Sequence, residues 1–157
     1  MLGYNNDFVI YDQDDSRTLT KGVIKNMQLD EKTFVPKAIQ GHISKYKNQM
    51  VKPEFLSRTA DGYFDEKLSE IYEKYQDALQ NNNALDFDDL LLKPLELFDE
   101  YPKRLEYYQQ KYRYVLVDEY QDTNRPQFEF VYNLSKEHRD ICVVGDDDQS
   151  IYSWRGA

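Results

Sequence analysis

The chain has 157 residues, of which 40% are hydrophobic and 31% charged, with six glycines, five prolines and a formal net charge of -9. A chain of this length forms one compact domain, or a small domain with part of another, and this composition favours a folded, helix-rich protein. The sequence has neither a run near the roughly 20 apolar residues of a membrane span nor the basic start and apolar core of a signal peptide, so we expect no membrane association and a cytoplasmic location.

The first half of the sequence has the periodicity of three helices after a short extended piece, DFVIYD. Apolar residues recur at three- and four-residue steps over residues 15–28, from residue 36 onward and over residues 61–79, which places them on one face of each helix. In the second of these helices, Lys45 and Lys47 are expected to project away from the apolar side. The asparagines at 81–83 are expected to end the third helix.

A further helix is predicted to begin at Asp86, because the stretch DFDDLLL puts acidic residues where the positive end of the helix dipole lies. Pro94 is expected to interrupt or kink it, since proline removes a backbone hydrogen bond. The helical period then continues from Leu95 to Tyr112.

Two strands follow, and the residues between them predict how they pair. The run YVLVD at residues 114–118 is short and β-branched, which is typical of a strand buried on both faces, and ICVVGD at residues 141–146 has the same character. A helix is predicted to begin near Asn124 and Pro126. A strand, a helix and a strand within about 30 residues form a parallel βαβ unit.

Positive charge is concentrated in residues 16–58, which hold nine basic and three acidic residues, a net charge of +6 that leaves -15 for the rest of the chain. Surface charge reaches only about 8 to 10 Å at physiological salt, so a locally basic region can track a phosphate backbone although the whole chain is acidic. Charge alone leaves a solvated basic face as an equal alternative.

The cysteine and the two histidines do not suggest a metal site. Cys142 lies in the apolar run ICVV, which predicts a buried, inert thiol. His42 and His138 have no second histidine or cysteine at ligand spacing, so a zinc site is not expected.

Acidic residues follow both predicted strands. Asp118 and Glu119 follow the first, and Asp146, Asp147 and Asp148 follow the second. Ligands gather outside the carboxyl ends of the strands in an open parallel sheet, so the two acidic ends are expected to be neighbours. Mg²⁺ takes one or two carboxylates together with substrate phosphates, and a second acid beside it can orient or deprotonate a water. One pair of acids is a weak signal, and the second acidic strand end strengthens it.

These strand ends carry a resemblance to a known family. VLVDEYQDTN at 115–124 and VVGDDDQSIYSWRGA at 143–157 resemble motifs II and III of the superfamily 1 DNA helicases of the UvrD/Rep/PcrA type, and ISKYKN at 43–48 and LDFDDLL at 85–91 resemble further stretches in the same order. The resemblance implies an α/β fold that is mostly helical. Residues 1–84 would form a helical DNA-binding subdomain, called 1B, and residues 85–157 part of a RecA-like ATPase subdomain, called 1A, with an incomplete parallel sheet that is a remnant of a P-loop NTPase.

The resemblance also implies roles for individual residues. Asp118 would hold the Mg²⁺ of Mg-ATP, Glu119 would polarise the water that attacks the γ-phosphate, and Gln149 would sense that phosphate. Gln121 and Asp122 are expected to position other groups rather than act in catalysis. DNA contacts are expected from Tyr152, Trp154, Arg155, Lys47 and Asn48, and stacking of a base on an aromatic ring is worth roughly 1 to 3 kcal/mol.

The sequence departs from the family pattern in one large respect. It contains no G-x-x-x-x-G-K-[ST] phosphate-binding loop, and nothing in it corresponds to the second RecA-like domain. Phosphoryl transfer needs that loop, its lysine, the metal and the arginines together. We therefore expect an internal fragment of a DNA helicase that neither hydrolyses ATP nor unwinds DNA by itself, although the full-length protein would do both.

Three further expectations follow. A two-stranded remnant of a sheet exposes an edge, so the chain is expected to self-associate or to be partly disordered. The main alternative function is a non-enzymatic DNA-binding or interaction module based on the basic segment. A nuclease would need carboxylates that converge on two metal ions about 3.5 to 4 Å apart, and the pattern DQSIY does not predict them.

Overall fold

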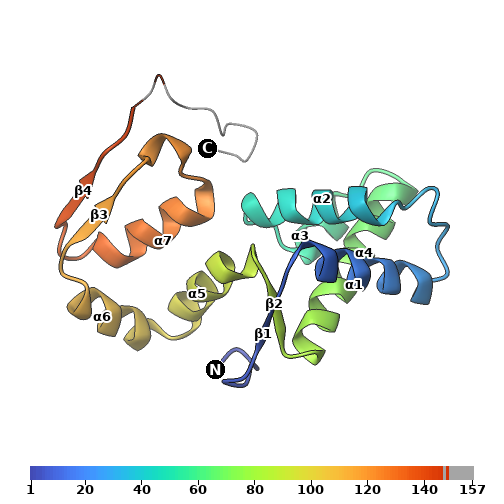
Figure 1. The fold of residues 1–157 in the computed structure, drawn as a ribbon, viewed down its shortest axis with the longest axis horizontal. Helices are drawn as coiled ribbons and strands as arrows, with labels where there is room; N and C mark the ends of the chain where they lie inside the picture. Colours follow the sequence, from blue (N-terminus) through green and yellow to red (C-terminus); the bar gives the residue numbers. More distant parts are fainter. Residues whose placement is uncertain (147, 149–157) are drawn as a thin grey trace. The chain divides into compact units, whose positions relative to one another are not determined.

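A computed structural model describes residues 1–146 and 148 of the chain (Figure 1). The chain divides into two compact units, of which the first is made essentially of Gly3–Lys47 and Val51–Leu90, and the second of Asn48–Met50 and the residues from Leu91 onward. Each unit contains helices and one two-stranded parallel sheet, so the fold is α/β and mostly helical.

The first unit is a group of helices around a small sheet. It contains β1 (Val9–Tyr11), α1 (Gln13–Asn26), α2 (Pro36–Asn48), α3 (Pro53–Thr59), α4 (Tyr63–Asn81) and β2 (Ala84–Asp86). Helices α1 and α3 pack against α4, and β1 pairs in parallel with β2. The helix periodicity read from the sequence is confirmed, because its apolar positions Ile24, Ile43 and Leu79 lie in the buried core.

Hydrogen bonds between neighbouring residues set the start of α1. Asp12 caps the helix, since its side chain accepts hydrogen bonds from the backbone N–H groups of Asp14 and Asp15, and the Asp15 carboxylate accepts from the N–H of Asp12 in return. This reciprocal pair satisfies amides that have no partner within the helix. The helix therefore begins two residues before the predicted position.

The structure departs from the prediction for residues 86–112 at three points. Asp86 ends strand β2 instead of opening a helix, and α5 (Asp89–Glu100) begins three residues later. Helix α5 continues through Pro94, so this proline does not interrupt it. The helical stretch instead breaks at Tyr101, where Pro102 occupies the first turn of α6 (Pro102–Lys111), a position that suits a residue without a backbone N–H.

The second unit contains the predicted βαβ arrangement. Strand β3 (Val115–Val117) leads through the short 3-10 helix η1 (Tyr120–Asp122) and helix α7 (Arg125–Ser135) to β4 (Ile141–Val143), which pairs with β3 in parallel. Asn124 and Gln127 form a capping box at the start of α7. A small core of Phe98, Leu105 and Leu134 holds α5, α6 and α7 together, and Val115 of β3 packs against it.

The two strands of this unit are not buried on both faces as predicted. The Leu116 side chain is 82% exposed, and Ile141 and Val143 are exposed as well. Val115 packs on the core, whereas Leu116 points to the opposite face, because successive side chains of a strand alternate. Cys142 is exposed, so the prediction of a buried thiol was also wrong.

The described residues were also searched for membrane spans. Among them, no helix combines the length and the apolar character needed to cross a membrane.

Candidate functional site

The backbone between β3 and β4 brings the two acidic strand ends together. The N–H of Val144 donates to the carbonyl of Val117 at 2.8 Å, and the N–H of Tyr120 donates to the carbonyl of Val144 at 3.0 Å. These bonds extend the parallel pairing past the last strand residues. The turn that begins at Asp118 and the segment that begins at Gly145 therefore start side by side, as the parallel pairing predicts.

Asp118 occupies the first position after β3. Its side chain is exposed, and one oxygen, Oδ1, accepts the N–H of Glu119 at 2.9 Å. A carboxylate has room for further ligands beyond one hydrogen bond. Within the part of the chain that the structure describes, no group of three or more His, Cys, Asp or Glu side chains gathers as a ligand set. A lone strand-end carboxylate fits a Mg²⁺ ion that keeps several waters and shares phosphate oxygens.

Glu119 has a left-handed backbone conformation, with φ at 53° and ψ at 41°. A residue with a long side chain seldom adopts this region, which is populated chiefly where surrounding contacts require it. The turn is held by the hydrogen bonds of the adjoining backbone, including the one from Asp122 N–H to the Glu119 carbonyl at 2.9 Å. The Glu119 carboxylate is in turn held through Oε2, which accepts from Nε2 of Gln121 at 2.5 Å.

Gln121 also contacts the other strand end. Its Oε1 atom accepts the backbone N–H of Asp146 at 2.9 Å, so one side chain links the acid after β3 to the segment after β4. The sequence indicated only a positioning role for Gln121. Its contact with the segment after β4 was missed, and the one available signal was the glycine at 145, which directly precedes the residue that Gln121 contacts.

Gly145 makes that contact possible. A Cβ atom at this position would lie 2.7 Å from Oε1 of Gln121 and 3.3 Å from both its backbone nitrogen and the Cβ of Tyr120. Real Cβ atoms do not approach an oxygen so closely, which means that any larger residue would push the Gln121 amide away. Gly145 is therefore a structural part of this site.

Lys47 lies in a different environment from the one predicted. Its side chain is 0% exposed, and Nζ contacts Oδ2 of Asp86 at 2.6 Å and Oδ1 of Asp89 at 2.9 Å. The hydroxyl of Tyr75 donates to the same Asp86 oxygen at 2.9 Å. The expectation that Lys47 projects away from the apolar side was wrong, because these two buried carboxylates require a cation beside them. Its ammonium group is not presented to a DNA backbone in this arrangement.

The two tyrosines beside this buried network, Tyr72 and Tyr75, have raised pKa values. Burial raises the pKa of Tyr75 above its usual range, and the negative charge of Asp86 raises it further. Burial likewise raises the pKa of Tyr72, with Asp89 as the next cause. Both phenols are therefore held in the protonated form well above the pH at which an exposed tyrosine ionises.

Of the remaining predicted site residues, the structure describes Asn48 and does not describe the others. Asn48, the last residue of α2, is half-buried, and its Oδ1 accepts from Nδ2 of Asn124 at 2.7 Å within the second unit. The others, which lie outside the described residues, are Gln149, Tyr152, Trp154, Arg155 and also Asp147.

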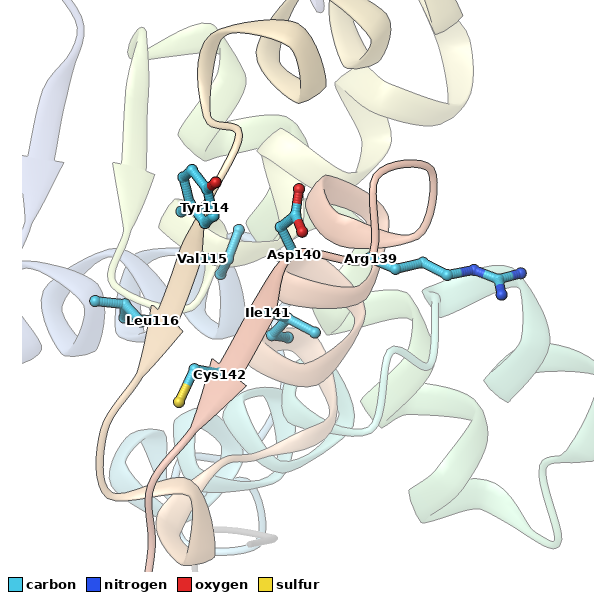
Figure 2. A pocket seen from close by; sticks show the side chains of 7 residues that line it. All are labelled: Tyr114, Val115, Leu116, Arg139, Asp140, Ile141 and Cys142. Carbon is cyan, nitrogen blue, oxygen red and sulfur yellow. The ribbon is translucent and has the colours of Figure 1, made fainter.

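The open face of the second sheet is apolar. Leu116 and Cys142 lie on this face, with Tyr114 just before β3. Val115, Asp140 and Ile141 also border the shallow hollow here, and the long side chain of Arg139 extends away from the strands (Figure 2). Contiguous exposed apolar surface of this kind marks interaction sites in soluble proteins. An exposed apolar surface is what self-association of the chain would need, and the self-association itself stays a prediction.

Comparison with known proteins gives one consistent result. The family model of the UvrD/REP helicase N-terminal domain matches residues 1–157. A protein named ATP-dependent DNA helicase PcrA from Bacillus subtilis is 48% identical over 156 residues, which are 99% of this chain and 21% of that protein. Proteins of the same name from Staphylococcus aureus and Staphylococcus epidermidis are 44% and 43% identical over the same length and coverage. The chain thus spans 21% of the length of the curated relatives it matches.

Proposed function

The chain belongs to the UvrD/REP helicase N-terminal domain family, and from this premise we propose that residues 1–157 are part of an ATP-dependent DNA helicase. The intact protein would couple Mg-ATP hydrolysis to translocation on single-stranded DNA and to unwinding of duplex. The relatives named above are ATP-dependent DNA helicases, which supports this class of activity. The residues from Leu91 onward would contribute motifs II and III of the RecA-like subdomain, and the first unit would be the helical subdomain 1B.

One observation carries this proposal. Asp118 and Glu119 follow the carboxyl end of a parallel strand, and Gln121 ties Glu119 to the end of the neighbouring strand. In open parallel sheets this edge is where nucleotides bind. Both acids of the proposed site are exposed, and they differ in their hydrogen bonds: Asp118 accepts the backbone N–H of Glu119, whereas the Glu119 carboxylate accepts from the side-chain amide of Gln121.

The chemistry divides between the two acids. Asp118 would ligate the Mg²⁺ of the nucleotide, and that ion, when bound, would neutralise charge that develops on the phosphates. Glu119 would orient the attacking water and accept its proton, and its hydrogen bond to Gln121 would fix the direction of the accepting oxygen. Gln149 would contact the γ-phosphate, and Tyr152, Trp154 and Arg155 would contact single-stranded DNA.

Substitution in the intact helicase tests this assignment. Glu119→Gln keeps the size of the side chain and removes the base, so we expect DNA-stimulated kcat to fall by about 100-fold or more while the KM for ATP changes little. Asp118→Asn should raise the Mg²⁺ concentration needed for half-maximal rate. Glu137→Gln, on an exposed residue after α7, is the matched control. A Glu119→Gln enzyme with wild-type turnover would refute the assignment.

The 157-residue chain alone is proposed to be inactive. It contains acids suited to the metal and the water but no G-x-x-x-x-G-K-[ST] loop, and phosphoryl transfer depends on all of these groups at once. A phosphate-release assay with and without single-stranded DNA measures this directly. DNA-stimulated turnover by the chain alone would contradict the proposal.

A second candidate is a DNA-binding module without enzymatic activity. Seven of the nine basic residues in the segment 16–58 are exposed, which favours contact with a polyanion. Binding of the 157-residue chain to a fluorescent single-stranded oligonucleotide that weakens steeply with salt would support it, because released counterions set that slope. Both functions can hold for one protein, and the oligonucleotide-binding experiment does not bear on catalysis, which the Glu119→Gln and Asp118→Asn variants and the phosphate-release assay test.

A further inference from the structure

The stretch 101–114 is both basic and rich in tyrosine. It holds four basic residues and one acidic residue, a net charge of +3 in a chain whose net charge is -9, and it contains five of the fourteen tyrosines of the chain. Most of the stretch is helix α6 (Pro102–Lys111). A local excess of positive charge on an acidic protein favours contact with an anionic ligand.

The cations and one tyrosine of α6 lie on the same face of the helix. Arg104, Tyr107 and Lys111 follow one another at steps of three and four residues, which places them on the side of α6 that faces away from the buried Leu105. Lys103 lies four residues before Tyr107 and shares that side. Two more exposed residues follow the helix, and together the six form the α6 surface: Lys103, Arg104, Tyr107, Lys111, Tyr112 and Arg113.

The aromatic rings of this surface hold one another in place. Tyr108 contacts the core residue Phe98, with 6.0 Å between the ring centres. The Tyr108 ring stacks on Tyr112 at 6.1 Å and meets Tyr107 edge-on at 5.2 Å. Nζ of Lys111 lies over the rings of Tyr107 and Tyr112, at 5.9 and 5.5 Å from their centres, which are cation–π contacts. Rings that are already fixed lose little conformational entropy when a partner binds.

The charges and hydroxyl groups of the α6 surface have no partner among the residues that the structure describes. None of its four cations forms an ion pair there, and neither the Tyr107 nor the Tyr112 hydroxyl forms a hydrogen bond. Stacking of a nucleobase needs an open ring face, whereas faces of these two rings are used by Lys111 and Tyr108. Cations and phenol O–H donors match carboxylates, which only accept hydrogen bonds.

We propose that the α6 surface is a docking site for an acidic segment of a partner protein. Its cations attract the segment, and the hydroxyls of Tyr107 and Tyr112 donate hydrogen bonds to the carboxylates of the partner. Tyrosine and arginine are among the residues that most often carry the binding energy of protein interfaces. The inference does not rest on the proposed function, because none of the six residues belongs to the candidate site or to the basic segment 16–58.

A fluorescein-labelled peptide of alternating glutamate and alanine is the probe for the 157-residue chain. Fluorescence polarisation should show saturable binding with a Kd below ~1 mM, and the binding should weaken as salt is added, because exposed charges are screened. Lys111→Glu should raise the Kd by about 5- to 10-fold, since attraction becomes repulsion. Arg125→Glu, which reverses an exposed cation on α7, is the matched control and should keep the Kd within about twofold.

The double variant of Tyr107→Phe and Tyr112→Phe separates a protein partner from a nucleic acid. It keeps both rings and removes both hydroxyls, so the Kd for the peptide should rise by about 10-fold, whereas stacking on a base would persist. The urea midpoint should not change, because both side chains are exposed. If the double variant binds the peptide like wild type, and Lys111→Glu weakens binding of a single-stranded oligonucleotide instead, the surface binds nucleic acid and the proposal is overturned.

The intact helicase gives the remaining outcomes. It should bind the peptide with the Kd of the 157-residue chain, and binding by the chain alone would show that the rest of the protein covers the surface, which overturns the proposal. DNA-stimulated ATPase of intact Lys111→Glu should stay within about twofold of wild type, and a larger fall would make this surface part of the helicase machinery. Absence of saturable peptide binding to wild type, or equal weakening in Arg125→Glu, also overturns the docking site. Full activity of Glu119→Gln would overturn the proposed function and leave this inference standing.

Discussion

Replacing Lys47 should destabilise the first unit of the chain rather than weaken DNA binding. Lys47 is fully buried between Asp86 and Asp89, with contacts of 2.6 and 2.9 Å. In Lys47→Met the methionine fills most of the same volume, and the two carboxylates remain buried without their cation. Removing one partner of a buried ion pair costs about 3 to 5 kcal/mol.

This cost can be measured as a shift in urea unfolding. With a denaturant slope of about 2 kcal/mol per molar, the unfolding midpoint of the first unit should fall by about 1.5 to 2.5 M. The chain has two compact units, so amide exchange in α4 gives a probe that reports on the first unit alone. Lys45→Met, which removes an exposed lysine two residues earlier in α2, should change the stability by no more than about 0.5 kcal/mol.

A triple variant tests the electrostatic cause. Adding Asp86→Asn and Asp89→Asn to Lys47→Met removes the unpaired charges and should recover part of the lost stability, because neutral replacement of a buried ion network is far less costly than breaking it. The reasoning is refuted if Lys47→Met unfolds at the wild-type urea concentration. It is also refuted if Lys47→Met weakens binding to single-stranded DNA with no loss of stability.

Three more outcomes are expected of the 157-residue chain. Leu116→Glu should leave the stability within about 0.5 kcal/mol, because the side chain is 82% exposed, and should reduce self-association in light scattering; an unchanged mass distribution would argue against that apolar face as the contact. The pKa values of Tyr72 and Tyr75 are raised in the folded chain, which therefore keeps protons that the unfolded chain releases above about pH 10. The urea midpoint should fall as the pH rises past about 10. Replacing both tyrosines with phenylalanine should flatten that fall. Asp12→Ala should cost about 1 kcal/mol through loss of the α1 cap, whereas equal midpoints for variant and wild type would show that the cap contributes nothing measurable.

The helices of the first unit could be predicted from the sequence because their signal is local. Apolar residues at three- and four-residue steps placed one helix at 61–79, and the structure has α4 at Tyr63–Asn81. The same holds for α1, which the structure places at Gln13–Asn26, two residues earlier at both ends than the predicted 15–28. The spacing of apolar residues within such a helix shows which of its faces is buried, so no information from a distant segment is needed.

Strand β2 could not be predicted in the same way. Its three residues are followed at once by an acidic pattern typical of a helix start, and its partner β1 lies more than seventy residues away, with Val9 opposite Ala84. Asp86 was taken as a helix-dipole residue, whereas its carboxylate binds Lys47 and Tyr75. Pairing between distant segments overrides local propensity, which is the general weakness of reading single sequences.

The neighbouring position of the two strand ends was predicted correctly, whereas the burial of the two strands was not. Parallel pairing of two apolar runs was enough to bring Glu119 and Asp146 together through Gln121. The same apolar runs predicted strands buried on both faces, and Leu116 and Cys142 are exposed. Apolar residues in a strand do not by themselves show which side chains are covered in the folded protein, because a large share of any protein surface is apolar.

The buried ion network also explains why two separate stretches carry the family resemblance. ISKYKN supplies Lys47, and LDFDDLL supplies both of its acidic partners, 39 and 42 residues further along the chain. Neither stretch is stable in this form without the other, because a buried lysine and two buried aspartates are each costly alone. The two stretches therefore act as one structural unit that fixes the end of α2 against the start of α5. From this we expect any relative that lacks a basic residue at the position of Lys47 to lack at least one of the two acids as well. A relative that has an apolar residue at that position and keeps both acids would show that the network is not what links the two stretches.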